Sequence, residues 1–200
     1  MKSMLTVGGV VLLAGFLWAQ ERIEPEIAKK YARVFVEQSA SLSGLQLKID
    51  ADPERPYGLK HEEVGALIIP DKRLSEAVLQ KLGKETAPLA QLWVRNLTIV
   101  VNDQLVPNDQ LRIVTVSANG KDHPLPLFLL GVRKKTADDL ELVVYGPNKE
   151  PLVLSPLKKI DGSQDLPIEL EGTKRDDGRG TLTLRILGKY QVELTLAKQE

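Results

Sequence analysis

Residues 181–196 read TLTLRILGKYQVELTL, and this stretch decides the fold class. Leu182, Leu184 and Ile186 alternate with polar residues, and the same alternation resumes in residues 190–196 after a short glycine turn. A period of two on both sides of a turn predicts an antiparallel hairpin with one buried face. We therefore expect Leu184, at the centre of the first strand, to point into the core.

Similar runs recur upstream, each alternating or wholly apolar and each bounded by turn residues. They cover residues 45–50, 64–69, 90–102, 111–117, 125–132, 140–144, 152–154 and 168–171. Strands at this spacing predict an antiparallel β-sandwich, or a partly open barrel, of about 8–10 strands that each keep one polar face.

Two details refine this expectation. In residues 90–102 the apolar positions change parity, which predicts a β-bulge near Arg95-Asn96. Asn119-Gly120 is the typical sequence of a tight hairpin turn, so the flanking runs should pair with each other.

One amphipathic helix is expected before the strands. Pro25 suits a first helical turn, and Ile27, Tyr31, Phe35 and Leu42 recur at helical spacing until residues 41–44 end the pattern. We expect this apolar stripe to dock on the protein's own strands, with docking on a partner as the alternative.

A second, short helix is predicted over about residues 73–82. Leu74, Val78 and Leu82 share one side of it, and Gly83 is placed to end it.

The first residues of the chain predict an export signal. Lys2 precedes the uncharged run Met4–Ala19, and Ala19 stands just before Gln20 and a polar continuation. The run is shorter than the roughly 20 apolar residues that cross a bilayer, so a retained anchor is the alternative.

We accordingly divide the chain into a signal peptide (1–19), an N-terminal helix (20–44) and one β-sandwich domain (45–200). The mature protein is expected to be periplasmic or secreted, with no stable membrane span after signal removal.

Composition excludes several classes of activity. The 27 Lys and Arg residues balance 27 Asp and Glu residues, so no basic excess attracts nucleic acid. The absence of cysteine excludes thiol nucleophiles, cysteine zinc sites and disulfides. No phosphate-binding or dinucleotide-binding glycine motif occurs, and we expect no cofactor.

Signals of catalysis are weak. His61-Glu62-Glu63 begins like a zinc-protease motif, but Gly65 stands where the second histidine is required. No serine lies in a nucleophile elbow, and His123 is the only other histidine. An enzyme, if the protein is one, would rely on carboxylates or on His61.

The segment from Asp50 to Glu63 is the candidate binding loop, because a connection between strands is a common place for recognition. Its candidate residues are two aspartates, a glutamate, a tyrosine and a histidine: Asp50, Asp52, Glu54, Tyr57 and His61. The three alternating carboxylates suit calcium, but Arg55 occupies the position where an EF-hand loop needs glycine. We therefore predict no metal site, and a solvated loop without function is the alternative.

The sequence favours an exported, non-catalytic protein that binds a protein or polymer, or that is a component of an envelope assembly. Two alternatives remain open. One is a hydrolase of envelope polymer, and the other is a carrier of a small ligand or ion.

Overall fold

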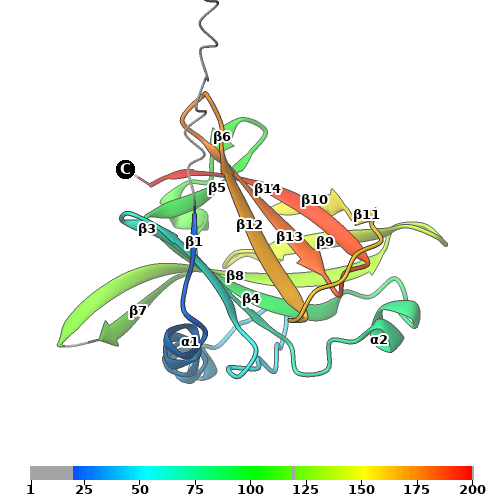
Figure 1. Cartoon of the computed structure of the whole chain (residues 1–200), viewed down its shortest axis with the longest axis horizontal. Coiled ribbons are helices and arrows are strands. Elements are labelled where there is room, and N and C mark those ends of the chain that lie inside the picture. Colours follow the sequence, from blue (N-terminus) through cyan, green and yellow to red (C-terminus); the bar gives the residue numbers. More distant parts are fainter. Residues whose placement is uncertain (1–19, 119, 200) are drawn as a thin grey trace, which may run out of the picture.

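The computed structural model describes residues 20–118 and 120–199 (Figure 1). These residues form a mainly β protein with fourteen strands, three of them only two residues long, and two α-helices. The predicted signal peptide, residues 1–19, lies outside the described residues. No helix within the described residues is long and apolar enough to cross a membrane.

Eight strands form the larger sheet. They are β1 (Glu21–Arg22), β2 (Tyr57–His61), β3 (Val64–Pro70), β4 (Ala87–Arg95), β7 (Ile113–Ala118), β8 (Lys121–Lys134), β9 (Leu140–Tyr145) and β10 (Val153–Pro156). Their order is β1-β2-β3-β4-β8-β9-β10, with β7 also paired to β8, and every pairing is antiparallel. The predicted hairpin around residues 119–120 is confirmed as β7–β8, although Asn119 itself is not among the described residues.

Six strands form the smaller sheet. They are β5 (Leu97–Val101), β6 (Gln104–Leu105), β11 (Lys158–Lys159), β12 (Ile168–Lys174), β13 (Gly180–Ile186) and β14 (Tyr190–Lys198). Their order is β12-β13-β14-β5-β6, with β11 also paired to β14, and the predicted C-terminal hairpin is confirmed as β13–β14. Each sheet has two end strands, so neither closes into a barrel.

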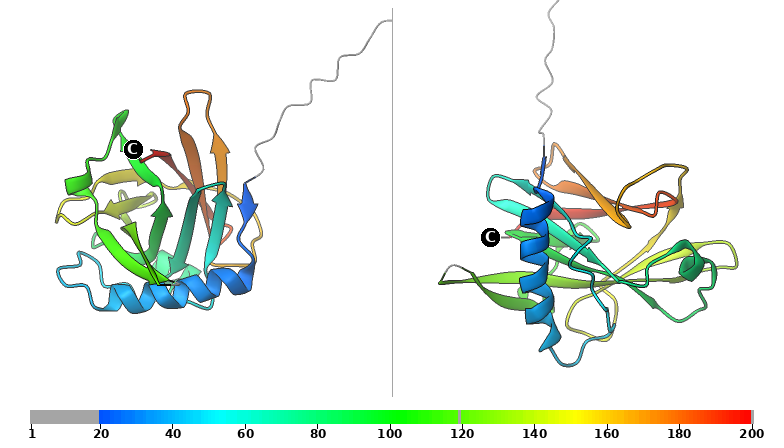
Figure 2. Two further views of the ribbon diagram at one scale, coloured as in Figure 1. Left: turned by 90° about the vertical axis from the view of Figure 1, so that its left-hand side faces the viewer. Right: turned by 60° about the horizontal axis from the view of Figure 1, so that its bottom comes forward.

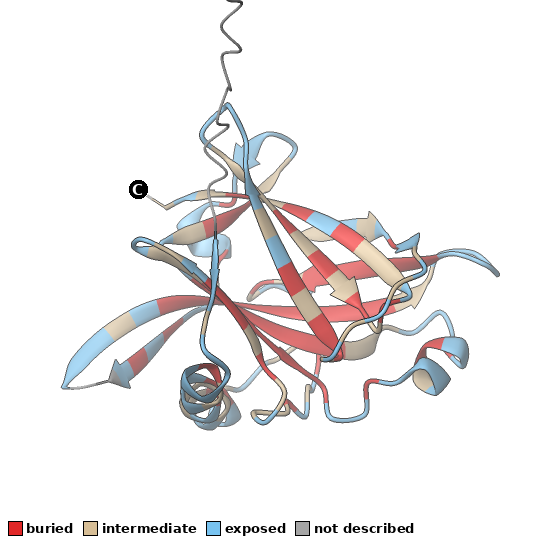
Figure 3. Cartoon of the chain, viewed as in Figure 1, coloured by how far each residue is buried: buried red, intermediate tan, exposed pale blue. Residues whose placement is uncertain are grey.

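One apolar core lies between the two sheets. Its buried members alternate along the strands of both sheets, including Leu92 and Val94 of β4, Phe128 of β8, and Leu184 and Ile186 of β13. The inner faces of both sheets are accordingly buried (Figure 3).

A second apolar core lies on the other face of the larger sheet, under the helix α1 (Pro25–Ala40; Figure 2). Leu67 of β3, Trp93 of β4 and Leu129 of β8 point into it. The central strands are therefore buried on both faces, which corrects the expectation of one polar face per strand. This double burial accounts for their nearly unbroken apolar sequences.

The helix α1 uses only part of the predicted stripe, because Phe35 and Leu42 pack against the second core but Ile27 and Tyr31 are not part of it. Ala28, Ala32 and Ser39 are its buried residues, whereas Ile27 and Tyr31 remain 44% and 45% exposed. Small side chains let the helix backbone lie close to the sheet. Ala28 and Ala32 therefore make the contact that Ile27 and Tyr31 were expected to make.

Buried polar groups anchor the end of α1 to β4. The Gln91 Nε2 atom donates to Ser39 Oγ over 3.0 Å, and the Trp93 Nε1 atom donates to Gln91 Oε1 over 3.1 Å. The ring centroids of Phe35 and Trp93 are 4.7 Å apart. Since Trp93 is 1% exposed, it is a core residue, and its ring is not available to stack against a ligand.

Residues 90–102 contain a change of sheet in place of the predicted bulge. β4 belongs to the larger sheet and β5 to the smaller, and Asn96 between them has φ of +54°. Its side-chain nitrogen donates to the Glu63 carbonyl over 2.9 Å. The parity changes because Leu92 and Ile99 face the same core from opposite sheets.

Two further predictions need correction. Residues 45–50 form no strand, and only a bridge from Ala51 to Asp71 follows them. Leu47 is nevertheless buried under α1, so the alternation of this segment reflects burial without strand pairing. The short helix α2 is limited to Glu76–Gln80, with Ser75 as its N-cap, and does not extend over residues 73–82.

Candidate functional site

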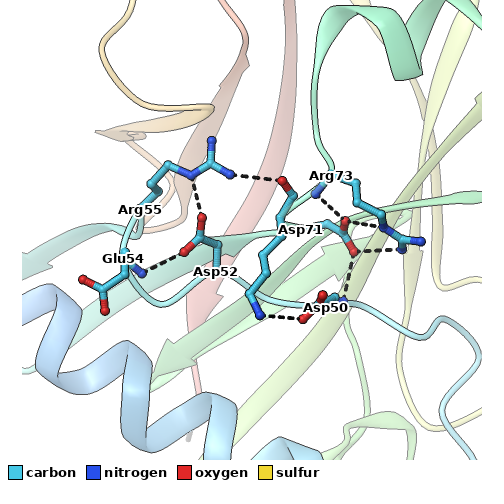
Figure 4. A network of polar contacts seen from close by, with 7 residues as sticks. Asp50, Asp52, Glu54, Arg55, Asp71 and Arg73 are labelled. Carbon is cyan, nitrogen blue, oxygen red and sulfur yellow. Dashed lines mark hydrogen bonds and ion pairs between the residues drawn. The ribbon is translucent and has the colours of Figure 1, made fainter.

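Asp71 organises the segment that begins the predicted binding loop, although the sequence did not single it out (Figure 4). The residue is 1% exposed. Its carboxylate accepts from the Asp50 backbone N–H over 2.9 Å and from the Arg73 backbone N–H over 2.9 Å. The Arg73 guanidinium adds contacts of 3.1 and 3.3 Å. This carboxylate therefore helps to fix the path of residues 50–52, together with backbone hydrogen bonds from Asp52 to Pro70 and from Lys72 to Asp50.

Two of the predicted carboxylates are paired with neighbouring cations. Asp50 Oδ1 lies 2.9 Å from Lys72 Nζ, and Asp52 Oδ2 lies 2.6 Å from Arg55 Nε. The other oxygen of Asp52 accepts from the Glu54 backbone N–H over 3.0 Å, an interaction within the turn. Figure 4 shows these side chains pointing to separate partners and not toward one centre.

Glu54 points away from both aspartates. It forms a two-pronged ion pair with Arg33 of α1, with distances of 2.8 to 3.1 Å. Both side chains are more than half exposed, so the pair contributes little to stability. Its role is to attach the loop to the helix.

Tyr57 and His61 lie at the two ends of strand β2 and not in a loop, which corrects that part of the expectation. The Arg22 guanidinium lies 4.6 Å from the centroid of the Tyr57 ring. Burial raises the pKa of the Tyr57 phenol, with Glu169 and Glu171 acting in the same direction. His61 lines a cleft between the sheets, at the other end of the strand.

The five predicted binding residues are therefore not gathered at one place. Asp50 and Asp52 share a network, Glu54 contacts α1, and Tyr57 and His61 belong to β2. Within the described residues, no three His, Asp or Glu side chains are grouped so that they could hold a metal ion.

Asp52 provides a test of this structural role. Burial opposes its ionisation, but the Arg55 side chain and the Glu54 N–H outweigh it and lower the pKa of the Asp52 carboxyl. A lowered pKa in the folded state stabilises the fold above the unfolded-state value of about 3.9 and less as the pH falls below it.

We expect Asp52→Asn to be less stable than the wild type at about pH 7, with a smaller difference at about pH 3. Urea unfolding of both proteins at both pH values measures this. The asparagine keeps an oxygen for the Glu54 N–H, and its amide nitrogen removes both the charge and the acceptor for Arg55. An equal difference at both pH values would show that the charge is irrelevant.

A cleft of about 230 Å³ lies between the two sheets. Strands β2 and β3 form one wall, and β12, β13, β14 and β5 form the other. Its floor is apolar and continuous with the core between the sheets: Leu59, Ala66, Leu97, Leu182 and Leu196.

The rim of this cleft is cationic. Lys60, Lys174, Arg179 and Lys198 line it together with a single acidic residue, Glu62. Acidic residues outside the lining are paired with some of these cations. Lys60 pairs with Glu21 over 3.1 Å, and Arg179 pairs with Asp103 over 2.7 Å. The lining itself therefore carries an excess of positive charge.

A glycine widens the mouth of the cleft. Gly172 occupies the inward parity of β12, after Ile168 and Leu170, and no side chain of its own fills that position. The end of the Gln20 side chain lies there instead, in the space that a Cβ atom would take. The residue immediately before β1 thus partly occupies the mouth.

A second hollow, of about 620 Å³, lies between residues 101–110 and 148–152. Turn residues form most of it, and its lining mixes carboxamides such as Asn102 and Asn148 with exposed apolar groups such as Leu105. It has neither a continuous apolar floor nor a consistent charge, so the inter-sheet cleft is the stronger candidate.

Sequence patterns alone do not predict this cleft. Lys60, Lys174, Arg179 and Lys198 come from distant parts of the chain, and each reads locally as a solvated strand or turn charge. One signal was present, because a glycine at the inward position of a strand marks a place where another group approaches closely. Gly172 is such a position.

The chain matches no known protein family, and no characterised protein or solved structure is significantly similar to it. The candidate site therefore stands on its own geometry.

Proposed function

We propose that this protein is an exported, non-catalytic β-sandwich that binds a protein or polymer, with the inter-sheet cleft as its binding site. The observation that carries the proposal is an apolar floor joined to a cationic rim in one hollow. Binding sites commonly combine a mostly apolar lining with a few polar groups that orient the ligand. The leader-like residues 1–19 support export.

The proposed sandwich description rests on the core between the sheets. Buried residues of β4, β8 and β9 meet those of β12, β13 and β14 in one cluster. The sheets separate at the cleft, where short side chains such as Ala66 and Gly172 leave room.

The arrangement of the carboxylates favours binding over hydrolysis. Asp50, Asp52 and Glu54 are each engaged by a cation, as described above, and so are poorly placed to transfer protons. Hydrolysis through these three carboxylates therefore has less support than binding in the cleft, and so does transport of a metal ion, since no metal-binding group of side chains occurs within the described residues.

The substitution Gly172→Leu tests the site directly. The new side chain should displace the flexible end of Gln20 and fill the mouth of the cleft, with little cost to the fold. Gly83→Leu is the matched control, because a Cβ at this exposed glycine meets nothing within 4 Å. We expect wild-type protein and the Gly83 variant to retain the same partner from envelope extract, and the Gly172 variant to lose it.

Melting temperatures of the three proteins should agree, which shows that the fold is intact. Retention of the partner by Gly172→Leu would place the binding site elsewhere. Turnover in a panel of glycan, peptide and ester substrates would contradict the non-catalytic assignment.

A further inference from the structure

We infer that the cleft binds an extended acidic peptide segment of a partner protein, added as a strand along the outer edge of β12. This inference rests on the proposed function and narrows its partner to a protein of stated chemistry. Three features carry it: the ends of the two sheets, the glycines of the lining, and the charge of the rim.

Both sheets have an end strand at the cleft. Within the described residues, β12 ends the smaller sheet, and β1, which pairs only Glu21 and Arg22 with β2, ends the larger one. The outer edge of an end strand offers backbone N–H and C=O groups to an added strand. Addition of a peptide strand to such an edge is a common mode of recognition.

Gly172 leaves the end strand β12 without a side chain at the mouth of the cleft. Gly65 of β3 and Gly180 of β13 also line the cleft, on strands that are paired on both sides. Glycine inside a strand often marks a place where a ligand or another chain comes close. The end of the Gln20 side chain already occupies the space beside Gly172.

The dimensions suit one or two side chains. A volume of about 230 Å³ is below the roughly 300–1,000 Å³ of pockets that enclose a whole small molecule. A peptide would place a single apolar side chain on the floor formed by Leu59, Leu182 and Leu196, and would keep its backbone at the mouth.

The charged residues around the cleft indicate which side chains the peptide carries and where its acidic residues lie. Lys174 at the end of β12 and Lys198 at the end of β14 stand beside the cleft with Arg179 and Lys60. Glu169 and Glu171 lie further along β12, and Glu169 is engaged with the backbone N–H groups of residues 165 and 166. Acidic residues of the peptide should therefore lie at the Lys174 end of the strand.

Three fluorescein-labelled octapeptides test the inference. The first alternates glutamate with leucine, the second alternates lysine with leucine, and the third is the first with alternate amides N-methylated. Fluorescence anisotropy should show that the first binds at least about tenfold more tightly than either of the others. Hydrogen exchange of residues 168–174 should slow when the first peptide binds.

Charge reversal in the rim adds a second test. Lys198→Glu should weaken binding of the acidic peptide about three- to tenfold. The matched control is Lys84→Glu, an exposed lysine that does not line the cleft, and it should have no effect. Equal binding of the lysine peptide would overturn the assigned charge, and equal binding of the N-methylated peptide would overturn the added strand.

The outcomes separate this inference from the proposed function. Dodecanoate serves as the probe for a lipid occupant, because it combines an apolar chain with a carboxylate. If dodecanoate binds in the cleft and the acidic peptide does not, the occupant is a lipid and the inference is wrong. If the envelope partner depends on Gly172 but no acidic peptide binds, the inference fails and the proposed function stands. If neither the partner nor the acidic peptide is affected by Gly172→Leu, both fail.

Discussion

Leu184→Ala should lower the free energy of unfolding by about 2–5 kcal/mol, because truncation of a buried leucine removes apolar contacts and leaves a cavity. Leu184 is fully buried at the centre of β13, between Leu170 of β12 and Val192 of β14 in the strand register. For a domain of this size the loss corresponds to a melting temperature lower by about 4–20 °C. Calorimetry and urea unfolding both measure it.

Thr183→Ala is the matched control on the opposite face of the same strand. Thr183 is half-buried and lies between Glu171 and Glu193, outside the core. Its truncation should change the free energy of unfolding by less than about 0.5 kcal/mol. Similar losses from both variants would show that the smaller sheet is covered on both faces.

The parts of the fold that depend on local chemistry were predictable from the sequence. The dipeptide Asn119-Gly120 and the glycine at position 188 mark hairpins because tight hairpin turns favour these residue types, and the strands on either side then pair with neighbours in the chain. Antiparallel hairpins need no information from distant residues. For the same reason the mainly β, antiparallel class followed directly from the alternation.

Features that depend on contacts between distant parts of the chain were not predictable. The parity change in residues 90–102 has one local explanation, a bulge, and one tertiary explanation, a strand that passes from one sheet to the other. Only the pairing of β5 with β14, which lies far along the chain, shows that the tertiary explanation is correct. Alternation alone also cannot distinguish a paired strand from a segment such as residues 45–50, which is buried without pairing.

The docking face of α1 illustrates a different difficulty. Large apolar residues at helical spacing suggest a buried stripe, but Ala28 and Ala32 on the adjacent stripe allow a closer approach to the sheet. Ile27 and Tyr31 are left about half exposed as a result. The sum of contacts along the whole helix decides the face, and a pattern of large residues does not report that sum.

The candidate site shows the same division. Three carboxylates that are close together in the sequence point to different cations: Asp50 to Lys72, Asp52 to Arg55 of its own turn, and Glu54 to Arg33 of α1. The cleft instead joins residues from both ends of the chain. Local clustering of polar residues thus indicated a structural network, and the hollow with binding chemistry arose from the arrangement of the sheets.

Asp71→Ala should destabilise the protein by about 2–4 kcal/mol, because a buried group that loses its hydrogen-bond partner costs about 1–3 kcal/mol. The Asp71 carboxylate accepts from the backbone N–H groups of Asp50 and Arg73. Alanine has no acceptor for either N–H group. Asp71→Asn keeps one oxygen and should lose an intermediate amount. Urea unfolding of the two variants beside the wild type measures both losses.

Asp50→Ala is the control that separates the buried carboxylate from its exposed neighbour. The Asp50 side chain is 61% exposed and contacts only Lys72 among the described residues, so its loss should cost no more than about 1 kcal/mol. The Asp50 backbone N–H still reaches Asp71 in this variant. If Asp50→Ala were as damaging as Asp71→Ala, the stability of the segment would lie in its surface charges. If only Asp71→Ala is damaging, the buried Asp71 carboxylate, and not the exposed Asp50 side chain, helps to hold the start of this segment in place.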